Sequence, residues 1–248
     1  MSFLSRDFWG KFYETFHINP GYRETGHLFL TSSFQKYQDL NSSDSHEILN
    51  LENLDKSQIQ ARWSHLSQLN LDYGVFCPLG GYLDHSKAIA GFVNGFEKVG
   101  GTLRLGVNAE NLITSGRRVV GINSSDGPLN ADAVLNCSGA MVSELTQYKH
   151  TSDPFKSRHH ELITVSLDTP ISEATPWLID VDNQVHLRPD GHGRVLIGGF
   201  LGKNDNNDIE RYRYDISNIW REDVLTAARR SFRLTSQKID VMRHWGGL

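Results

Sequence analysis

The 248-residue sequence predicts an α/β (α+β) protein with two different sheet arrangements. An amphipathic helix over 84–101 is followed by short strands that are separated by glycine turns, which is typical of a helix next to a β-meander. From residue 151 onward, strands and polar loops follow one another without regular alternation of strand and helix. This second pattern predicts a mixed or antiparallel sheet with a helix packed on it.

The composition indicates a globular protein and weighs against several classes of partner. Hydrophobic residues make up 38% and charged residues 22% of the chain, and the formal net charge of -4 argues against nucleic acid. No apolar run is long enough for a membrane span, and the N-terminus lacks the features of a signal peptide. The two cysteines, Cys77 and Cys137, fit free thiols in a reducing compartment, so we expect a cytoplasmic protein of unknown oligomeric state.

The first 85 residues predict helices around two short strands. Residues 3–16 have apolar side chains at helical spacing, and 34–72 indicate one or more further helices. The segment 27–33 (HLFLTSS) is predicted to be a strand. A second strand in 73–85 is interrupted by Pro78 and the turn that follows it.

The helix over 84–101 shows the clearest periodicity. Its predicted buried face consists of Ile89, Phe92, Val93, Phe96 and Val99. After Gly100, which is placed to cap the helix, we expect a strand over 102–107 (TLRLGV). The meander then comprises NLITS, VVGINSS and ADAVLNC, with turns at Gly116-Arg117 and Asp126-Gly127.

Five elements are predicted after residue 158. The first three are strands over 159–167, 184–189 and 194–200. A helix over 217–232 and a last strand over 238–245 follow.

Three short motifs are rejected because of their spacing. The segment GGFLGKN (198–204) lacks the first glycine and the final Ser or Thr of a phosphate loop. Ser138 lacks the flanking glycine of a nucleophile elbow, because Asn136 stands there. Adjacent histidines in a strand point to opposite faces, so we predict no metal site at His159, His160, Glu161, His186 and His192.

The stretch ADAVLNCSGAMVSEL (131–145) follows the meander and combines an apolar strand with small residues and a helix start. Such a strand-turn unit occurs where a dinucleotide lies across strand ends, because small residues leave room for the ligand. An α/β protein with an ordinary tight turn remains the alternative interpretation of this pattern.

A resemblance extends over roughly residues 20–248. Four segments in the same order are similar to the D-amino-acid-oxidase superfamily of flavoenzymes, in particular to the branch of glycine oxidase, sarcosine oxidase and dimethylglycine dehydrogenase. They are GYLDHSKAIAGFVNGFEKVGGTL, VVGINSSDGPLNADAVLNCSGAMVSEL, VHLRPDGHGRVLIGGF and MRHWGGL.

The resemblance implies FAD as cofactor and oxidation of the C–N bond of an amino acid or N-methylated amine, with hydride transfer to the flavin. Oxygen or a carrier then takes the electrons. It implies a partial Rossmann-like FAD-binding domain over 81–150, a discontinuous substrate domain over 1–80 and 151–245, and the start of a C-terminal FAD motif at 246–248. Two alternatives stay open: a 2-hydroxy-acid oxidoreductase, and a non-catalytic binding or regulatory subunit.

Residues that match the family's cofactor motifs follow from the resemblance. Cys137, Ser138, Gly139 and Ala140 match the turn near FAD, where Met141 stands at a position often held by Trp. Asn108, Ala109 and Glu110 match the strand end beside the adenine, although the family usually has Val at the position of Ala109. Gly246 and Gly247 match the start of the motif that meets the ribityl and pyrimidine end.

The predicted catalytic residues are His186 and Arg188. His186 stands where glycine oxidase has a Tyr that contacts substrate, and Arg188 lies two residues further along the same strand. Residues i and i+2 share a strand face, so both side chains could point toward the flavin, and Arg188 could hold a carboxylate in a bidentate pair. An ordinary solvent-facing strand is the alternative.

The sequence also departs from the family. It has no Gly-x-Gly-x-x-Gly stretch for the pyrophosphate and ends at HWGGL, before the family's last flavin contacts. We therefore expect a fragment of a longer flavoenzyme that on its own binds FAD weakly.

Overall fold

The computed structural model describes residues 2–42, 48–66, 69, 71–142, 145, 159–200, 216–234 and 238–247. The chain forms two compact units. The first comprises Met1–Gly95, His160–Lys203 and Tyr212–Gly247, and the second comprises Phe96–His159, Asn204–Arg211 and Leu248. Among the described residues, no helix is long and apolar enough to cross a membrane.

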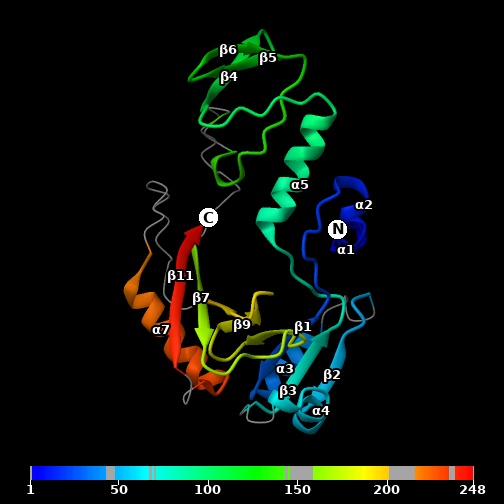
Figure 1. The fold of residues 1–248 in the computed structure, drawn as a ribbon, viewed down its shortest axis with the longest axis vertical. Helices are drawn as coiled ribbons and strands as arrows, with labels where there is room; N and C mark the ends of the chain where they lie inside the picture. Colours follow the sequence, from blue (N-terminus) through cyan, green and yellow to red (C-terminus); the bar gives the residue numbers. More distant parts are fainter. Residues whose placement is uncertain are drawn as a thin grey trace. The chain divides into compact units, whose positions relative to one another are not determined.

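The first unit contains an eight-stranded mixed sheet in the order β11-β7-β10-β9-β8-β1-β3-β2 (Figure 1). Its neighbours are antiparallel except for the parallel pair β1 and β8. The strands are β1 (His27–Thr31), β2 (Glu52–Asp55), β3 (Tyr73–Cys77), β7 (His160–Leu167), β8 (Trp177–Asp180), β9 (Val185–Pro189), β10 (Val195–Gly199) and β11 (Ile239–Gly247). The predicted mixed sheet is therefore confirmed.

Two strands of this sheet were not predicted. Strand β2 has the sequence ENLD and was assigned to a helical region, because its single buried residue, Leu54, gives no alternating pattern. Strand β8 has only four residues between loops. Strand β2 is fixed by pairing with β3, and β8 by pairing with the adjacent β9 and with β1, which is remote in sequence. A segment of four residues does not reveal such pairing.

One face of the sheet is covered by helix α7 (Asn218–Ser231), which packs on β9 and β10. The side chain of Ser217 caps this helix by accepting a hydrogen bond from the Trp220 amide at 3.1 Å. Buried apolar residues at alternating strand positions form the core with α7: Leu28, Leu30, Ile163, Val165, Leu178, Val185, Leu187, Val195, Ile197, Trp220, Val224 and Ala228. The opposite face of the same strands is thereby left for other contacts.

A buried polar contact joins β7, β11 and the start of α7. The Glu161 carboxylate lies 2.6 Å from Nε2 of His244, and the same oxygen accepts the Ser217 amide at 2.9 Å. The His244 ring stacks on Trp220, and the side chains of Glu161 and His244 are almost completely buried. Each partner therefore depends on the other for satisfaction of a buried polar group.

Besides α7, the described helices of the first unit are α1 (Ser2–Gly10), α2 (Phe12–Phe16), α3 (Phe34–Asn41), α4 (Lys56–Arg62) and η1 (Ser64–Leu66), and α5 (His85–Lys98) begins in it. The single helix predicted over 3–16 is wrong. The chain instead forms α1 and α2 with a turn between them at Lys11, and His17 ends α2 in the left-handed conformation.

Helix α5 forms as predicted, but its predicted buried face is wrong. Ile89 is 59% and Val99 83% exposed, whereas Ala88 and Gly91 are buried. Helix α5 packs its Gly91 side against the aromatic rings of α1 and α2, which leaves Ile89 and Val99 exposed. A side chain at Gly91 would place its Cβ 2.4 Å from the Phe12 ring, so the close approach needs a glycine. Phe92 stacks on Phe8 at the edge of this contact, with ring centroids 5.9 Å apart.

The second unit contains a three-stranded meander, with β4 (Ala109–Ser115), β5 (Arg118–Ser124) and β6 (Gly127–Asn130) in sequential order. The first two strands match the predicted NLITS and VVGINSS, but the third is β6 and not the predicted ADAVLNC. The strands predicted over 102–107 and 131–137 are not formed, and Leu105 and Leu135 are 82% and 87% exposed. A strand needs a neighbouring strand to share its backbone hydrogen bonds. Among the described residues, these two segments form only one such bond, from the Ala131 amide to the Val120 carbonyl. The helix start predicted after Cys137 is the short helix η2 (Gly139–Met141).

The buried contact of Glu161 leads to a stability prediction. Replacement Glu161→Ala leaves His244 and the Ser217 amide without their acceptor, so we expect the free energy of unfolding to fall by about 3–5 kcal/mol. Urea denaturation followed by circular dichroism measures this. Glu222→Ala on the exposed side of α7 is the control, with an expected loss below about 0.5 kcal/mol. A loss for Glu161→Ala as small as that of the control would contradict the role of the contact.

Candidate functional site

The face of the large sheet opposite α7 gathers polar and aromatic side chains. His186 and Arg188 alternate along β9, and cross-strand pairing places Ile179 and Gly198 beside His186. On the next strands, Trp177 of β8 pairs with His27 of β1. Because paired residues share a sheet face, these side chains form one surface within the first unit.

Arg188 is largely buried and is held by aromatic rings. Its guanidinium lies 4.2 Å from the centroid of the Tyr82 ring and 5.5 Å from that of Trp177. Its Nη1 donates to the Pro189 carbonyl at 2.8 Å, whereas its Nε is buried without a partner. Burial lowers the pKa of Arg188, an effect opposed by Tyr82 and Asp190. The group nevertheless stays charged near neutral pH, because arginine starts from so high a pKa.

His186 is 9% exposed and lies between two aromatic rings. Its ring centroid is 5.2 Å from Trp177 and 6.1 Å from Phe200. Gly198 makes room for it, because a Cβ there would lie 2.5 Å from the imidazole. Burial, followed by the positive charge of Arg188, lowers the pKa of His186 to about 4. The imidazole is therefore neutral at pH 7.

Three further residues of this surface were not predicted from the sequence. They are His27, Tyr82 and Trp177, and each has a buried polar atom without a partner: Nε2 of His27, Oη of Tyr82 and Nε1 of Trp177. Burial lowers the pKa of His27, and the Arg188 charge adds to this effect. No local motif marks these residues, since they come from three separate segments that meet only through strand pairing.

Five of the buried side-chain atoms that lack a hydrogen-bond partner in the described residues therefore lie around Arg188. They belong to His27, Tyr82, Trp177, His186 and Arg188. Buried polar groups are normally satisfied, and such a concentration is expected where a ligand supplies the missing partners. The donors Arg188 Nε and Trp177 Nε1 suit an acceptor such as a carboxylate.

The predicted cofactor residues of the second unit lie at exposed turns. Asn108, Ala109 and Glu110 are at the start of β4, where the Asn108 amide donates to Ser125 Oγ at 3.0 Å. Cys137 is an exposed free thiol, and the Ser138 amide donates to Asn136 Oδ1 at 3.1 Å.

The turn that contains these residues continues into η2. Gly139 has a positive φ of 58°, a conformation that suits glycine, and Ala140 follows it in the short helix. Cys137, Ser138 and Gly139 are exposed, and small exposed residues in a glycine turn leave the backbone open to a ligand, which fits the cofactor contact that the sequence predicts.

Gly246 and Gly247 are the last residues of β11, opposite Glu161 and His160 of β7. They belong to the first unit, as do His186 and Arg188. Among the described residues, no atom apart from those of its chain neighbours lies within 4 Å of the position that a Cβ would take at Gly247, so the strand end also has room beside its backbone.

The low pKa of His186 leads to a prediction for its titration. We expect its ring resonances to titrate at a pH of about 4 in NMR spectra. Its unfolded-state pKa is about 6.5, so its contribution to stability is lost as the pH falls from 6.5 to 4. Arg188→Gln removes one positive neighbour and should raise the pKa, although burial still keeps it below 6.5. The exposed substitution Arg230→Gln is the control and should change nothing. A wild-type pKa near 6.5 would refute the buried, neutral state.

Comparison with known proteins shows similarity over the whole chain. Residues 1–248 match the family model described as DAO: FAD dependent oxidoreductase. L-proline dehydrogenase from P. horikoshii superposes with a TM-score of 0.79 at 15% identity, over 99% of this chain and 65% of that chain. Glycine oxidase from Bacillus cereus ATCC 14579 gives a TM-score of 0.77 at 15% identity, over 100% of this chain and 67% of that chain.

Two further proteins are similar. Iminodiacetate oxidase from Chelativorans sp. BNC1 has a TM-score of 0.74 at 17% identity and covers 98% of this chain and 66% of that chain. The mitochondrial pyruvate dehydrogenase phosphatase regulatory subunit of Mus musculus is 32% identical over 92 residues, which are 36% of this chain and 10% of the mouse protein. The chain thus spans 65% of the length of the proline dehydrogenase and a tenth of the mouse protein. With a family model that matches every residue, the chain belongs to the DAO family of FAD-dependent oxidoreductases.

Proposed function

We propose that this protein contributes the substrate-binding face of an enzyme that oxidises the C–N bond of an amino acid or N-methylated amine, with FAD as cofactor. The main support is the group of five unpartnered buried polar atoms around Arg188, in a chain of the DAO family. A substrate with a carboxylate and an amine supplies the acceptors and donors that this group lacks.

Arg188 is the proposed carboxylate anchor. A guanidinium binds a carboxylate through two parallel hydrogen bonds, and such a pair is strongest where water is excluded. The rings of Tyr82 and Trp177 restrict the side chain and exclude solvent from it. Among the described residues Arg188 forms no ion pair, so its charge is available to a ligand.

His186 is proposed to bind the substrate next to the reacting carbon through a hydrogen bond from its neutral imidazole. A group with a pKa of about 4 is a weak base at neutral pH, so His186 is not expected to take a proton from a substrate ammonium. Its position beside Arg188 instead disfavours a second positive charge and so favours the neutral amine, from which a hydride leaves more readily. The flavin, when bound, supplies the hydride acceptor.

The cofactor is proposed to contact Asn108, Ala109 and Glu110, the turn from Cys137 to Ala140, and Gly246 with Gly247. The small side chains and the positive φ of Gly139 support this role. The division into an FAD-binding part over 81–150, a substrate part over 1–80 and 151–245, and a C-terminal motif at 246–248 is part of the same proposal.

The names of the similar solved structures support an amino-acid or amine substrate. They include a proline dehydrogenase, a glycine oxidase and an iminodiacetate oxidase, each named for a compound that has both an amine and a carboxylate. Both oxidases and a dehydrogenase occur among them, so oxygen and a carrier both remain proposed electron acceptors.

The carboxylate role of Arg188 predicts a selective loss of substrate affinity. In Arg188→Gln, we expect KM for amino acids to rise about 100-fold, because a buried charge-assisted pair is lost. For amines without a carboxylate, KM should change less than about threefold. Reduction of the flavin under anaerobic conditions measures both, with Arg230→Gln on the exposed side of α7 as the control. An equal effect on both classes of amine would contradict the anchor.

A second candidate is a non-catalytic subunit that regulates a partner enzyme. The 32% identity with part of the mouse regulatory subunit favours it. Anaerobic mixing of the purified, FAD-supplied protein with amines, amino acids and 2-hydroxy acids separates the alternatives. Bleaching of the flavin by amines or amino acids supports our proposal, and bleaching by 2-hydroxy acids alone assigns the alternative substrate. FAD binding without reduction by any of these compounds favours the regulatory subunit.

A further inference from the structure

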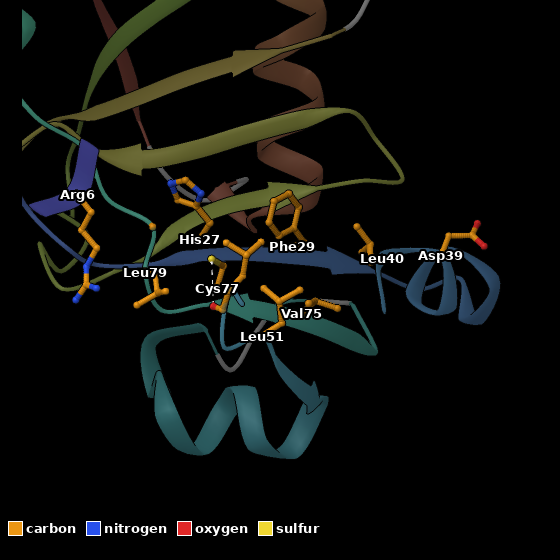
Figure 2. A pocket seen from close by; sticks show the side chains of 11 residues that line it. Arg6, His27, Phe29, Asp39, Leu40, Leu51, Val75, Cys77 and Leu79 are labelled. Carbon is orange, nitrogen blue, oxygen red and sulfur yellow. Dashed lines mark hydrogen bonds between the residues drawn. The ribbon is translucent and has the colours of Figure 1, made fainter. Parts of the chain in front are cut away.

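A pocket of about 500 Å³ lies along β1 and β3 in the first unit (Figure 2). Its walls are mainly apolar and include Phe29, Leu40, Leu49, Leu51, Val75 and Leu79. A volume of this size and an apolar lining are typical of a site for a small molecule.

The pocket opens on the sheet face that carries the candidate site. Phe29 and His27 alternate with the core residues Leu28 and Leu30 on β1, and His27 pairs with Trp177 across the sheet. The side chains that line the pocket on β1 therefore lie on the same face as Trp177 and its neighbour Arg188.

The two ends of the pocket differ in charge. Asp39 lies with Leu40 at one end, whereas His27 and Leu79 lie toward the other (Figure 2). Arg6 also lines the pocket, but its guanidinium is paired with Glu24 at 2.8 Å. Asp39 is exposed and accepts a hydrogen bond from Gln35 at 2.9 Å, and it is the one acidic residue among the described residues that line the pocket, so the negative part of a ligand is better placed at the His27 end.

Arg188 lies next to this His27 end. The His27 ring meets Trp177 edge-on at a centroid distance of 5.2 Å, and the Arg188 guanidinium covers Trp177 and Tyr82. Tyr82 follows the pocket residue Gly80 by two positions. A carboxylate bound by Arg188 would thus have the apolar pocket beside it.

We infer that this pocket is the side-chain subsite of the enzyme and that the preferred substrate is a carboxylate with a large apolar side chain, such as a leucine-like amino acid or its N-alkyl derivative. The inference rests on the proposed function, in which Arg188 holds the carboxylate. Glycine has no side chain to fill the pocket. Each methylene that moves from water into the apolar pocket increases affinity.

A chain-length series of simple acids tests the inference without catalysis. Straight-chain carboxylates from acetate to octanoate are titrated into the purified protein by calorimetry. We expect Kd to fall about fourfold for each added methylene until the pocket is full. Arg188→Gln should weaken all acids by a similar factor and leave this dependence on length intact.

Filling the pocket should remove the dependence on length. Cys77 is a buried free thiol in the lining, so Cys77→Phe places a ring in the cavity, and the matched control Cys77→Ser removes the thiol without filling the space. We expect octanoate to lose at least tenfold in affinity in Cys77→Phe, while acetate stays within about threefold. Leu79→Trp is a second filling variant at a less buried position and guards against a folding defect in the first.

Three results would overturn the inference: absence of carboxylate binding, equal affinity for all chain lengths, or an unchanged length dependence in both filling variants. These results are distinct from a failure of the proposed function. If acids bind with a length-dependent affinity but no amine or amino acid reduces the flavin, the subsite inference is supported and the oxidase proposal is refuted. If alanine and leucine reduce the flavin with equal kcat/KM and acids show no length-dependent binding, the oxidase proposal is supported and the subsite inference is refuted.

Discussion

The candidate site depends on one buried positive charge, the guanidinium of Arg188. Burial of a charge is costly unless a partner compensates for it, and among the described residues Arg188 has aromatic rings and one carbonyl rather than a carboxylate. Burial, with a smaller contribution from the Arg188 charge, lowers the pKa of His186 and His27, so both imidazoles are neutral at pH 7. A cation surrounded by neutral acceptors and donors forms a site that is complementary to an anion with an adjacent amine.

The large sheet makes this arrangement possible because alternate residues of each strand point to opposite faces, so core residues lie on one face and the site residues on the other. One face of β1, β8, β9 and β10 supplies the core, and α7 packs on β9 and β10. The other face presents His27, Trp177, His186 and Arg188 from three adjacent strands. Since each strand is anchored by its buried residues, the positions of the polar side chains are fixed before any ligand binds.

The sequence predicted the parts of this arrangement that depend on local patterns. His186 was identified from the family resemblance, and Arg188 because it lies two positions further along the same strand and so shares its face. The first two strands of the meander were identified from the glycine turn between them. The residues His27, Tyr82 and Trp177 were missed because only pairing between distant segments brings them to Arg188. The errors over 102–107 and 131–137 have the same origin, since strand propensity alone does not form a strand without a neighbour. The exposed face of α5 shows that periodicity identifies an apolar stripe but not the side of the helix that meets its partner.

The central claim is that the unpartnered polar atoms around Arg188 bind a substrate carboxylate. A crystal structure of the FAD-supplied protein with a non-oxidisable amino-acid analogue tests it most directly. The account predicts both carboxylate oxygens within about 3 Å of the Arg188 guanidinium nitrogens, as in a bidentate pair. An analogue bound with its carboxylate at another cation, and Arg188 still without an anionic partner, would contradict it.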